Sequence, residues 1–194
     1  AKAGFHRLRS QGSLIRDADP GLFLYRQALD GHSQIGLACC CRVQDYLDDV
    51  IRKHERTRKD KVDARTRHMR AVDANTGPVF LTFRDHEPLD HLMALDSSAR
   101  PGFHFRSDDG VTHTGWKVAD PAPYIEAFAD IPEFYVADGH HRTASAARAA
   151  QEIALAQSRD SIDGTSESDW FLSVLFPASQ LTILSYNRVV RTRG

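Results

Sequence analysis

The sequence has no long apolar run, no excess of charge of either sign and few cysteines. Its 194 residues hold 25 Lys and Arg against 26 Asp and Glu, which gives a formal net charge of −1. A protein that binds nucleic acid through its overall charge is more basic than this. No apolar stretch approaches the roughly 18–20 residues that a membrane span needs. We therefore expect neither a membrane nor a nucleic acid as the main partner.

The three cysteines are consecutive, at Cys39, Cys40 and Cys41. An odd, adjacent trio cannot form a disulfide framework, and it lacks the CxxC spacing of a zinc site. Free cysteines behave as small apolar residues and persist in reducing compartments. We expect a strand with buried cysteines, Cys39 and Cys41 on one face, in a cytoplasmic protein.

The common nucleotide-binding and hydrolase signatures are also absent. The sequence has no GxxxxGK[ST], GxGxxG, GxSxG or HExxH motif and no CxxC pair. These absences disfavour a P-loop NTPase, a Rossmann dehydrogenase and an α/β-hydrolase.

A chain of this length, with 41% hydrophobic residues, is enough for one domain with a substantial core. We predict a single α/β domain over residues 1–194, in the α+β sense, with a mixed sheet and flanking helices. The sequence opens on Ala-Lys-Ala-Gly without a methionine. We therefore expect a processed chain or a fragment of a longer protein.

Apolar periodicity and turn residues predict strands and helices that interleave irregularly. Strands are predicted near 22–25 and at 35–43, 79–83, 133–137, 170–176 and 181–190. Helices are predicted at 43–54, within 52–70, at 88–95 and 121–130, and from about 140 to 158. Segments 103–106 and 111–118 flank a Ser-Asp-Asp-Gly turn and predict a hairpin, and 159–168 predicts a flexible loop.

The densest set of polar side chains is Asp138-Gly139-His140-His141-Arg142, between a predicted strand and a predicted helix. A helix N-terminus offers unpaired N–H groups and the positive end of a dipole, so it attracts anions. Gly139 permits close approach to the backbone, Arg142 can bind phosphate oxygens in a fork, and the histidines add donors. The carboxylate of Asp138 would repel an anion. The roles that remain for Asp138 are to cap the helix, to orient a histidine or to bind a metal ion.

A second set, His54 and Glu55, opens a cation-rich stretch. Nine Lys or Arg stand against three acids between residues 52 and 70. The simplest interpretation is a solvated charged helix face. The functional interpretation makes Glu55 a base that takes a proton from a substrate hydroxyl while Arg and Lys side chains hold phosphate.

A third set comes from the predicted hairpin. If residues 107–110 form the turn, Arg106 pairs with Val111 and His104 pairs with His113 on one face. With His140 as a third ligand, these histidines would suit a transition metal. Cross-strand histidine pairs are more often ordinary surface residues, so we assign no metal site.

Five segments, in order along the chain, resemble a family of uncharacterised bacterial and archaeal proteins related to the free-serine kinases of the ParB/sulfiredoxin-like superfamily. They span most of the sequence: Tyr25-Arg26-Gln27, Lys53-His54-Glu55-Arg56-Thr57, Gly77-Pro78-Val79-Phe80-Leu81, Ala137-Asp138-Gly139-His140-His141-Arg142 and Tyr186-Asn187-Arg188-Val189-Val190.

This resemblance implies a compact ParB/sulfiredoxin-like mixed α/β fold with nucleotide phosphates at the turn from Asp138 to Arg142. The kinase relatives use a nucleotide donor, here ADP or ATP, with Mg²⁺ to phosphorylate the hydroxyl of free serine, and a glutamate is their base. We assign Glu55 and His54 to catalysis. Thr57, Arg65 and His113 are assigned to substrate contact or support.

The sequence thus predicts a nucleotide-dependent kinase for a serine-like metabolite. A nucleotide-binding regulatory or DNA-associated ParB-like module is the alternative, because the basic stretch between residues 52 and 70 resembles a surface that follows a phosphate backbone. A metal-dependent hydrolase using His104, His113 and His140 is a third possibility.

Overall fold

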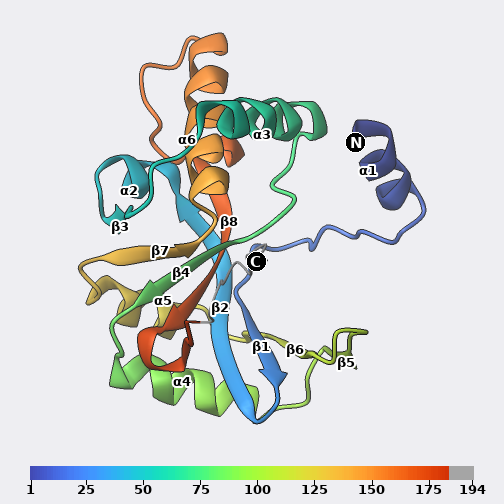
Figure 1. Cartoon of the computed structure of the whole chain (residues 1–194). Coiled ribbons are helices and arrows are strands. Elements are labelled where there is room, and N and C mark those ends of the chain that lie inside the picture. Colours follow the sequence, from blue (N-terminus) through green and yellow to red (C-terminus); the bar gives the residue numbers. More distant parts are fainter. Residues whose placement is uncertain (184–194) are drawn as a thin grey trace, which may run out of the picture.

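The computed structural model describes residues 1–183 and shows one mixed sheet with helices on both faces (Figure 1). The sheet has eight strands in the order β3-β7-β4-β8-β2-β1-β6-β5. Their bounds are β1 Phe23–Leu29, β2 His32–Arg42, β3 Ile51–Arg52, β4 Val79–Phe83, β5 Phe103–Arg106, β6 Thr112–Lys117, β7 Phe134–Asp138 and β8 Trp170–Pro177. The mixed α/β class predicted from the sequence is confirmed.

Strand β8 joins the two parts of this sheet. It pairs in parallel with β4, which leads to β7 and β3, and antiparallel with β2, which leads to β1, β6 and β5. Most of the neighbouring strands are antiparallel, and the β3–β7 and β4–β8 pairs are the parallel ones among the described strands.

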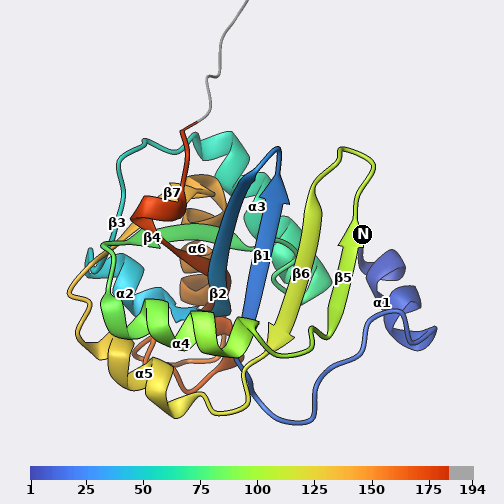
Figure 2. The ribbon, with the colours of Figure 1, turned by 90° about the horizontal axis from the view of Figure 1, so that it is seen from below.

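The helices form two layers. Figure 2 shows α4 and α5 in front of the sheet and α3 and α6 behind it. Their bounds are α1 Lys2–Ser10, α2 Val43–Leu47, α3 Lys59–Val72, α4 Glu87–Ser97, α5 Ala122–Ala129 and α6 His140–Ala156, with short 3₁₀ turns η1 Glu167–Asp169 and η2 Ala178–Gln180. None of the helices in residues 1–183 has the length and apolar character needed to cross a bilayer.

Alternation of burial along β4 shows that one face of this strand lies in the core. Val79, Leu81 and Phe83 are buried in turn, as the two-residue period of a strand requires. Phe83 packs against Phe128 of α5, with ring centroids 5.3 Å apart. Full burial of side chains of this size contributes about 1.5–3 kcal/mol each.

Small residues bring α6 close to α3. The hydroxyl of Ser145, which is fully buried, donates to the carbonyl of Val62 at 3.3 Å, and Thr66 Oγ1 donates to the carbonyl of Ser145 at 3.4 Å. Bulky side chains at these positions would keep the two helices apart. The alanine-rich sequence of α6 therefore sets its start firmly against α3.

Several sequence-based predictions are corrected. The helix predicted at 43–54 ends at Leu47, because Asp49 adopts a left-handed backbone (φ 57°) that an α-helix cannot contain. Helix α1 forms in a segment for which no element was predicted, but it buries none of its residues. A strand was predicted at 181–190. Residues 181–183 do not form a strand, and residues 184–190 lie outside the described part of the chain.

The hairpin register also differs from the prediction by one residue. Gly110 has a positive φ of 86° and adds an extra residue to the turn, so that the amide of Ser107 donates to the carbonyl of Val111 at 2.9 Å. His104 therefore pairs with Thr114, and Phe105 pairs with His113. The two histidines lie on opposite faces of the hairpin.

The cysteines occupy β2 as predicted, but burial is uneven. Cys39 and Cys41 are half-buried, whereas Cys40 points to the other face and is exposed. The expectation of three buried cysteines is therefore wrong for Cys40.

Candidate functional site

The sheet topology brings two of the sequence segments singled out above together at the start of α6. Strand β7 ends at Asp138, and Gly139 (φ 103°) turns the chain directly into the helix. A Cβ on Gly139 would lie 3.0 Å from Arg142 Nε in a backbone conformation that other residues rarely adopt. The loop between β3 and α3, which holds His54 and Glu55, lies against this helix start.

His140, the first residue of α6, is the buried titratable group of the site. Its side chain is 5% exposed, and its Nδ1 lies 3.4 Å from Oε2 of the exposed Glu55. Its ring meets the ring of His54 edge to face, with centroids 4.4 Å apart. Its buried Nε2 has no hydrogen-bond partner within residues 1–183.

Burial is the main cause that lowers the pKa of His140, and the neighbouring His54 acts in the same direction. The carboxylates of Glu55 and Asp138 oppose this effect. The imidazole is therefore neutral at neutral pH, and it can accept a proton or a hydrogen bond at a ring nitrogen.

His141 connects α6 to α3. Its Nε2 accepts a hydrogen bond at 3.1 Å from the backbone amide of Arg58, the residue that precedes α3. This bond satisfies one of the amides that a helix start leaves unpaired. His141 therefore holds the loop of residues 53–58 in place.

Arg142 lies on a different side of α6 from His140, because residues two apart on a helix do not share a face. Its Nη1 donates to the carbonyl of Pro78 at 2.6 Å, and its Nη2 pairs with the exposed carboxylate of Asp138. Asp138 makes no capping hydrogen bond to the helix. The structure shows a role for Asp138 that the sequence did not suggest, which is to orient the guanidinium of Arg142.

Arg142 also lines a cavity of about 370 Å³, here called the arginine cavity. Arg65 and His68 from α3 line it too, and no acidic side chain of residues 1–183 is among its lining residues. Because Arg142 is paired with Asp138, Arg65 is the arginine of this cavity that has no ion-pair partner within those residues. The full lining is Arg65, His68, Met69, Asn75, Thr76, Gly77, Val79, Arg142, Phe171 and Leu172. A cavity with this charge attracts anions.

The cation-rich stretch between residues 52 and 70 is less positive than its sequence suggests. Five of its nine cations form ion pairs with acidic side chains: Arg52, Lys53, Arg58, Lys59 and Arg70. Within the described part of the chain, the other four have no ion-pair partner: Arg56, Lys61, Arg65 and Arg67. Of these four, Arg65 is the one that lines the arginine cavity.

The remaining sequence-predicted residues divide into near and distant ones. Thr57 is half-buried in the loop beside the start of α6. His113 lies on β6, five strand positions from β7, which is about 24 Å at the usual strand spacing. Its ring nitrogens contact Tyr25 Oη at 2.6 Å and Ser107 Oγ at 2.9 Å, so it supports the hairpin and lies outside the site.

The three histidines considered as ligands of a transition metal do not lie together in the structure. His104 and His113 lie on opposite faces of the hairpin, and His140 lies near the other end of the sheet. Across residues 1–183, no three His, Cys, Asp or Glu side chains are grouped in a way that could hold a metal ion.

Sequence reasoning missed His68, Asn75 and Thr76, which line the arginine cavity. A partial signal was present, because Arg65, His68 and Met69 have the i, i+3, i+4 spacing of one helix face. The loop residues gave no such signal, since only the fold places them opposite Arg142.

A family described as "Protein of unknown function (DUF1015)" matches the chain over residues 1–194. No curated protein and no solved structure matched this chain. The family description assigns no activity, so the argument for function depends on the site.

Proposed function

The chain belongs to the DUF1015 family over residues 1–194, and from the geometry of its site we propose that it is a nucleotide-dependent phosphotransferase. It transfers a phosphoryl group from ADP or ATP to the hydroxyl of a serine-like small metabolite. The observation that carries this proposal is the arginine cavity, where Arg65, His68 and Arg142 converge and none of the acidic side chains in residues 1–183 contributes to the lining.

The start of α6 adds to the attraction for phosphate. The backbone amides of His140, His141 and Arg142 have no hydrogen-bond acceptor within residues 1–183. Such amides bind phosphate oxygens, and the helix dipole favours the negative charge. The guanidinium of Arg142 is already oriented by Asp138 and Pro78, so little side-chain freedom is lost when it binds.

Glu55 is the proposed base. Its carboxylate is exposed to solvent and lies beside the neutral imidazole of His140. The hydroxyl oxygen of the acceptor attacks the terminal phosphorus, its proton passes to Glu55, and the bond to the bridging oxygen of the nucleotide breaks. Positioning and charge neutralisation supply most of the rate in such reactions.

Mg²⁺ would neutralise charge on the phosphates of the bound nucleotide. Proteins commonly hold Mg²⁺ through one or two carboxylates together with substrate phosphates, without a cage of protein ligands. Within residues 1–183 no such cage is present, and Asp138 is an exposed carboxylate immediately before α6. Asp138 would hold the ion together with the phosphates, which leaves Glu55 free to act as the base.

Calorimetric titration with ADP, ATP or CTP, each with Mg²⁺, tests the phosphate site. We expect the wild type to bind and Arg142→Ala to bind about 10–100-fold more weakly, because a hydrogen bond to a charged group contributes about 1.5–3 kcal/mol. Arg65→Ala should weaken binding similarly. This exposed side chain has no ion pair within the described residues, so its loss should not perturb folding.

Arg67→Ala is the matched control, because Arg67 is an exposed arginine on the same helix that does not line the arginine cavity. It should bind nucleotide like the wild type. Glu55→Gln should retain binding and lower the rate of serine phosphorylation by about 100-fold or more. Absence of binding to the wild type, or unchanged binding in both Arg65→Ala and Arg142→Ala, would overturn the proposal.

A further inference from the structure

A second cavity of about 830 Å³ adjoins the arginine cavity. We call it the tryptophan cavity, after Trp170 at the start of β8. Its apolar wall is formed by Met69 of α3, by Ala146, Ala149 and Ile153 of α6, and by Trp170. Nucleotide and cofactor sites commonly have this size and this mainly apolar lining.

The two cavities share part of their walls. Met69 and Asn75 line both of them, so the two cavities are neighbours at these two side chains. One part of this combined space is cationic. The other is mainly apolar, with Arg16, Arg70, Asp73 and Glu167 as its charged lining residues. A nucleotide has the same division, with phosphates at one end and a planar base at the other.

We infer that the tryptophan cavity receives the base of the nucleotide whose phosphates bind in the arginine cavity. This inference rests on the function proposed above and adds the recognition of the base to it. Trp170 offers an aromatic ring on which a base can stack, as bases do on aromatic side chains in proteins that bind single-stranded nucleic acid. A base would also cover the apolar surfaces of Met69 and Ile153, which a phosphate alone would leave in contact with water.

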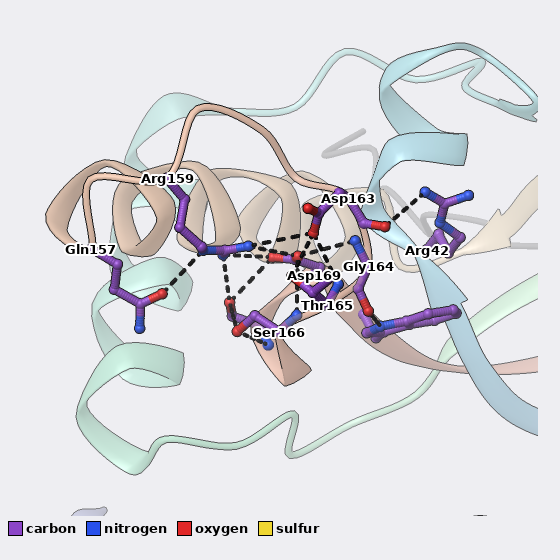
Figure 3. A network of polar contacts seen from close by, with 10 residues as sticks. Arg42, Gln157, Arg159, Asp163, Gly164, Thr165, Ser166 and Asp169 are labelled. Atoms are coloured by element: carbon purple, nitrogen blue, oxygen red, sulfur yellow. Dashed lines mark hydrogen bonds and ion pairs between the residues drawn. The ribbon is translucent and has the colours of Figure 1, made fainter.

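Trp170 is held in a fixed orientation by the loop before it. Its indole Nε1 donates to the carbonyl of Gly164 at 3.0 Å, and Asn75 Nδ2 donates to its backbone carbonyl at 3.3 Å. The fully buried Asp169 anchors this loop, because its carboxylate receives both terminal nitrogens of Arg159 at 2.8 Å and the amide of Gly164 at 3.2 Å (Figure 3). A rigid wall binds a flat ring with little loss of entropy.

Fluorescence offers a direct test, since the chain has two tryptophans. Trp116 is buried on β6, and Trp116→Phe leaves Trp170 as the single indole. In this variant, ADP with Mg²⁺ should change the Trp170 emission on titration. Pyrophosphate with Mg²⁺ should bind without changing it, because it carries no base.

A cavity-filling variant gives the second test. Ala149→Leu places extra atoms in the tryptophan cavity, and we expect it to weaken ADP binding about tenfold or more while pyrophosphate binding changes less than about twofold. Ala156→Leu is the control, because this exposed alanine on the same helix does not line the cavity. It should change neither affinity.

Two results separate the inference from the proposed function. If ADP binds and depends on Arg142 but neither perturbs Trp170 nor responds to Ala149→Leu, the base lies elsewhere and the inference alone is overturned. If neither ADP nor pyrophosphate binds the wild type, the proposed function fails and the inference fails with it. Should Ala149→Leu not fold, the Trp170 emission decides.

Discussion

His140 is a titratable side chain in a nearly closed environment, with His54, Glu55, Asp138 and His141 as its charged or titratable neighbours. Burial and the adjacent His54 lower its pKa. A group that takes up a proton less readily in the folded state than in the unfolded state makes folding pH-dependent. The burial that keeps the imidazole neutral at neutral pH therefore also makes the stability of the protein sensitive to acid.

The sign of this dependence follows from the direction of the pKa shift. Above the ordinary histidine pKa of about 6.5, both states are neutral and stability is unaffected. As the pH falls below this value, the unfolded chain binds a proton first, so stability is lost until the folded-state pKa is passed. We expect the free energy of unfolding in urea to decrease between about pH 7.5 and about pH 5.5.

His140→Gln removes this proton site and should make the decrease smaller. His32→Gln, at an exposed position of the first hairpin, should follow the wild type. An equal pH dependence in wild type and His140→Gln would show that other groups cause it.

The grouping of polar side chains at the start of α6 was predictable from their density in the sequence, but their individual contacts were not. Asp138 and Arg142 are four apart on a strand-to-helix turn, and an ion pair between them is a local possibility. The contact of His140 with Glu55 joins residues 85 positions apart and depends on how β3 pairs with β7. No local pattern in the sequence encodes that pairing.

Strands and helices were predictable where periodicity is strong and turns are short. Val79–Phe83 and Phe103–Arg106 have the predicted limits. The helix predicted at 43–54 was too long, because the apolar spacing in the sequence continues past Asp49, where the backbone adopts a left-handed conformation. The hairpin register was wrong by one because a single glycine at positive φ adds an unpaired residue to the turn.

The loop between α6 and β8 shows that a polar sequence can still be well anchored. We predicted a flexible loop at 159–168. The structure instead places the carboxylate of Asp169, with 0% exposure, at the centre of its hydrogen bonds, paired with an Arg159 side chain that is 21% exposed (Figure 3). Removing one partner of a buried ion pair costs about 3–5 kcal/mol. Because Arg159 keeps some contact with water, we expect Asp169→Asn to lose about 3 kcal/mol.

Chemical denaturation of Asp169→Asn measures this loss, and Asp160→Asn is the control. Asp160 is an exposed acid in the same loop, so its change should stay within about 0.5 kcal/mol. The hydrogen bond with Arg159 lowers the pKa of Asp169. The difference between Asp169→Asn and wild type should therefore be largest above about pH 4 and shrink as the pH falls through the folded-state pKa. A difference that persists unchanged in acid would contradict the ion-pair explanation.

Across the complete molecule, the α/β class followed from the irregular alternation of strands and helices, whereas the strand order did not. Neighbours in the sheet such as β1 and β6, or β2 and β8, are far apart in sequence. Apolar strands carry no local information on which distant partner they choose. The candidate site lies between elements that this order brings together, so its full lining required the structure.

Overall charge bears on the DNA-associated alternative. The net charge is −1, and five of the nine cations between residues 52 and 70 are paired with acids. We expect no shift of a labelled duplex in a gel assay at about 150 mM salt and about 10 µM protein, conditions under which many nonspecific DNA-binding proteins associate. A basic DNA-binding protein serves as positive control. A shift whose affinity falls steeply with added salt would revive this alternative.

The position of β8 has a consequence for the order of events during synthesis. Residues before it can form β1, β2, β6 and β5 as one group and β3, β7 and β4 as another, and of the strands within residues 1–183 only β8 joins the two groups. At its start, Trp170 lines the tryptophan cavity, and Phe171 and Leu172 line the arginine cavity. On the ribosome, the nascent chain must therefore expose residue 177 before the sheet closes, and a polypeptide released earlier would present two unpaired strand edges.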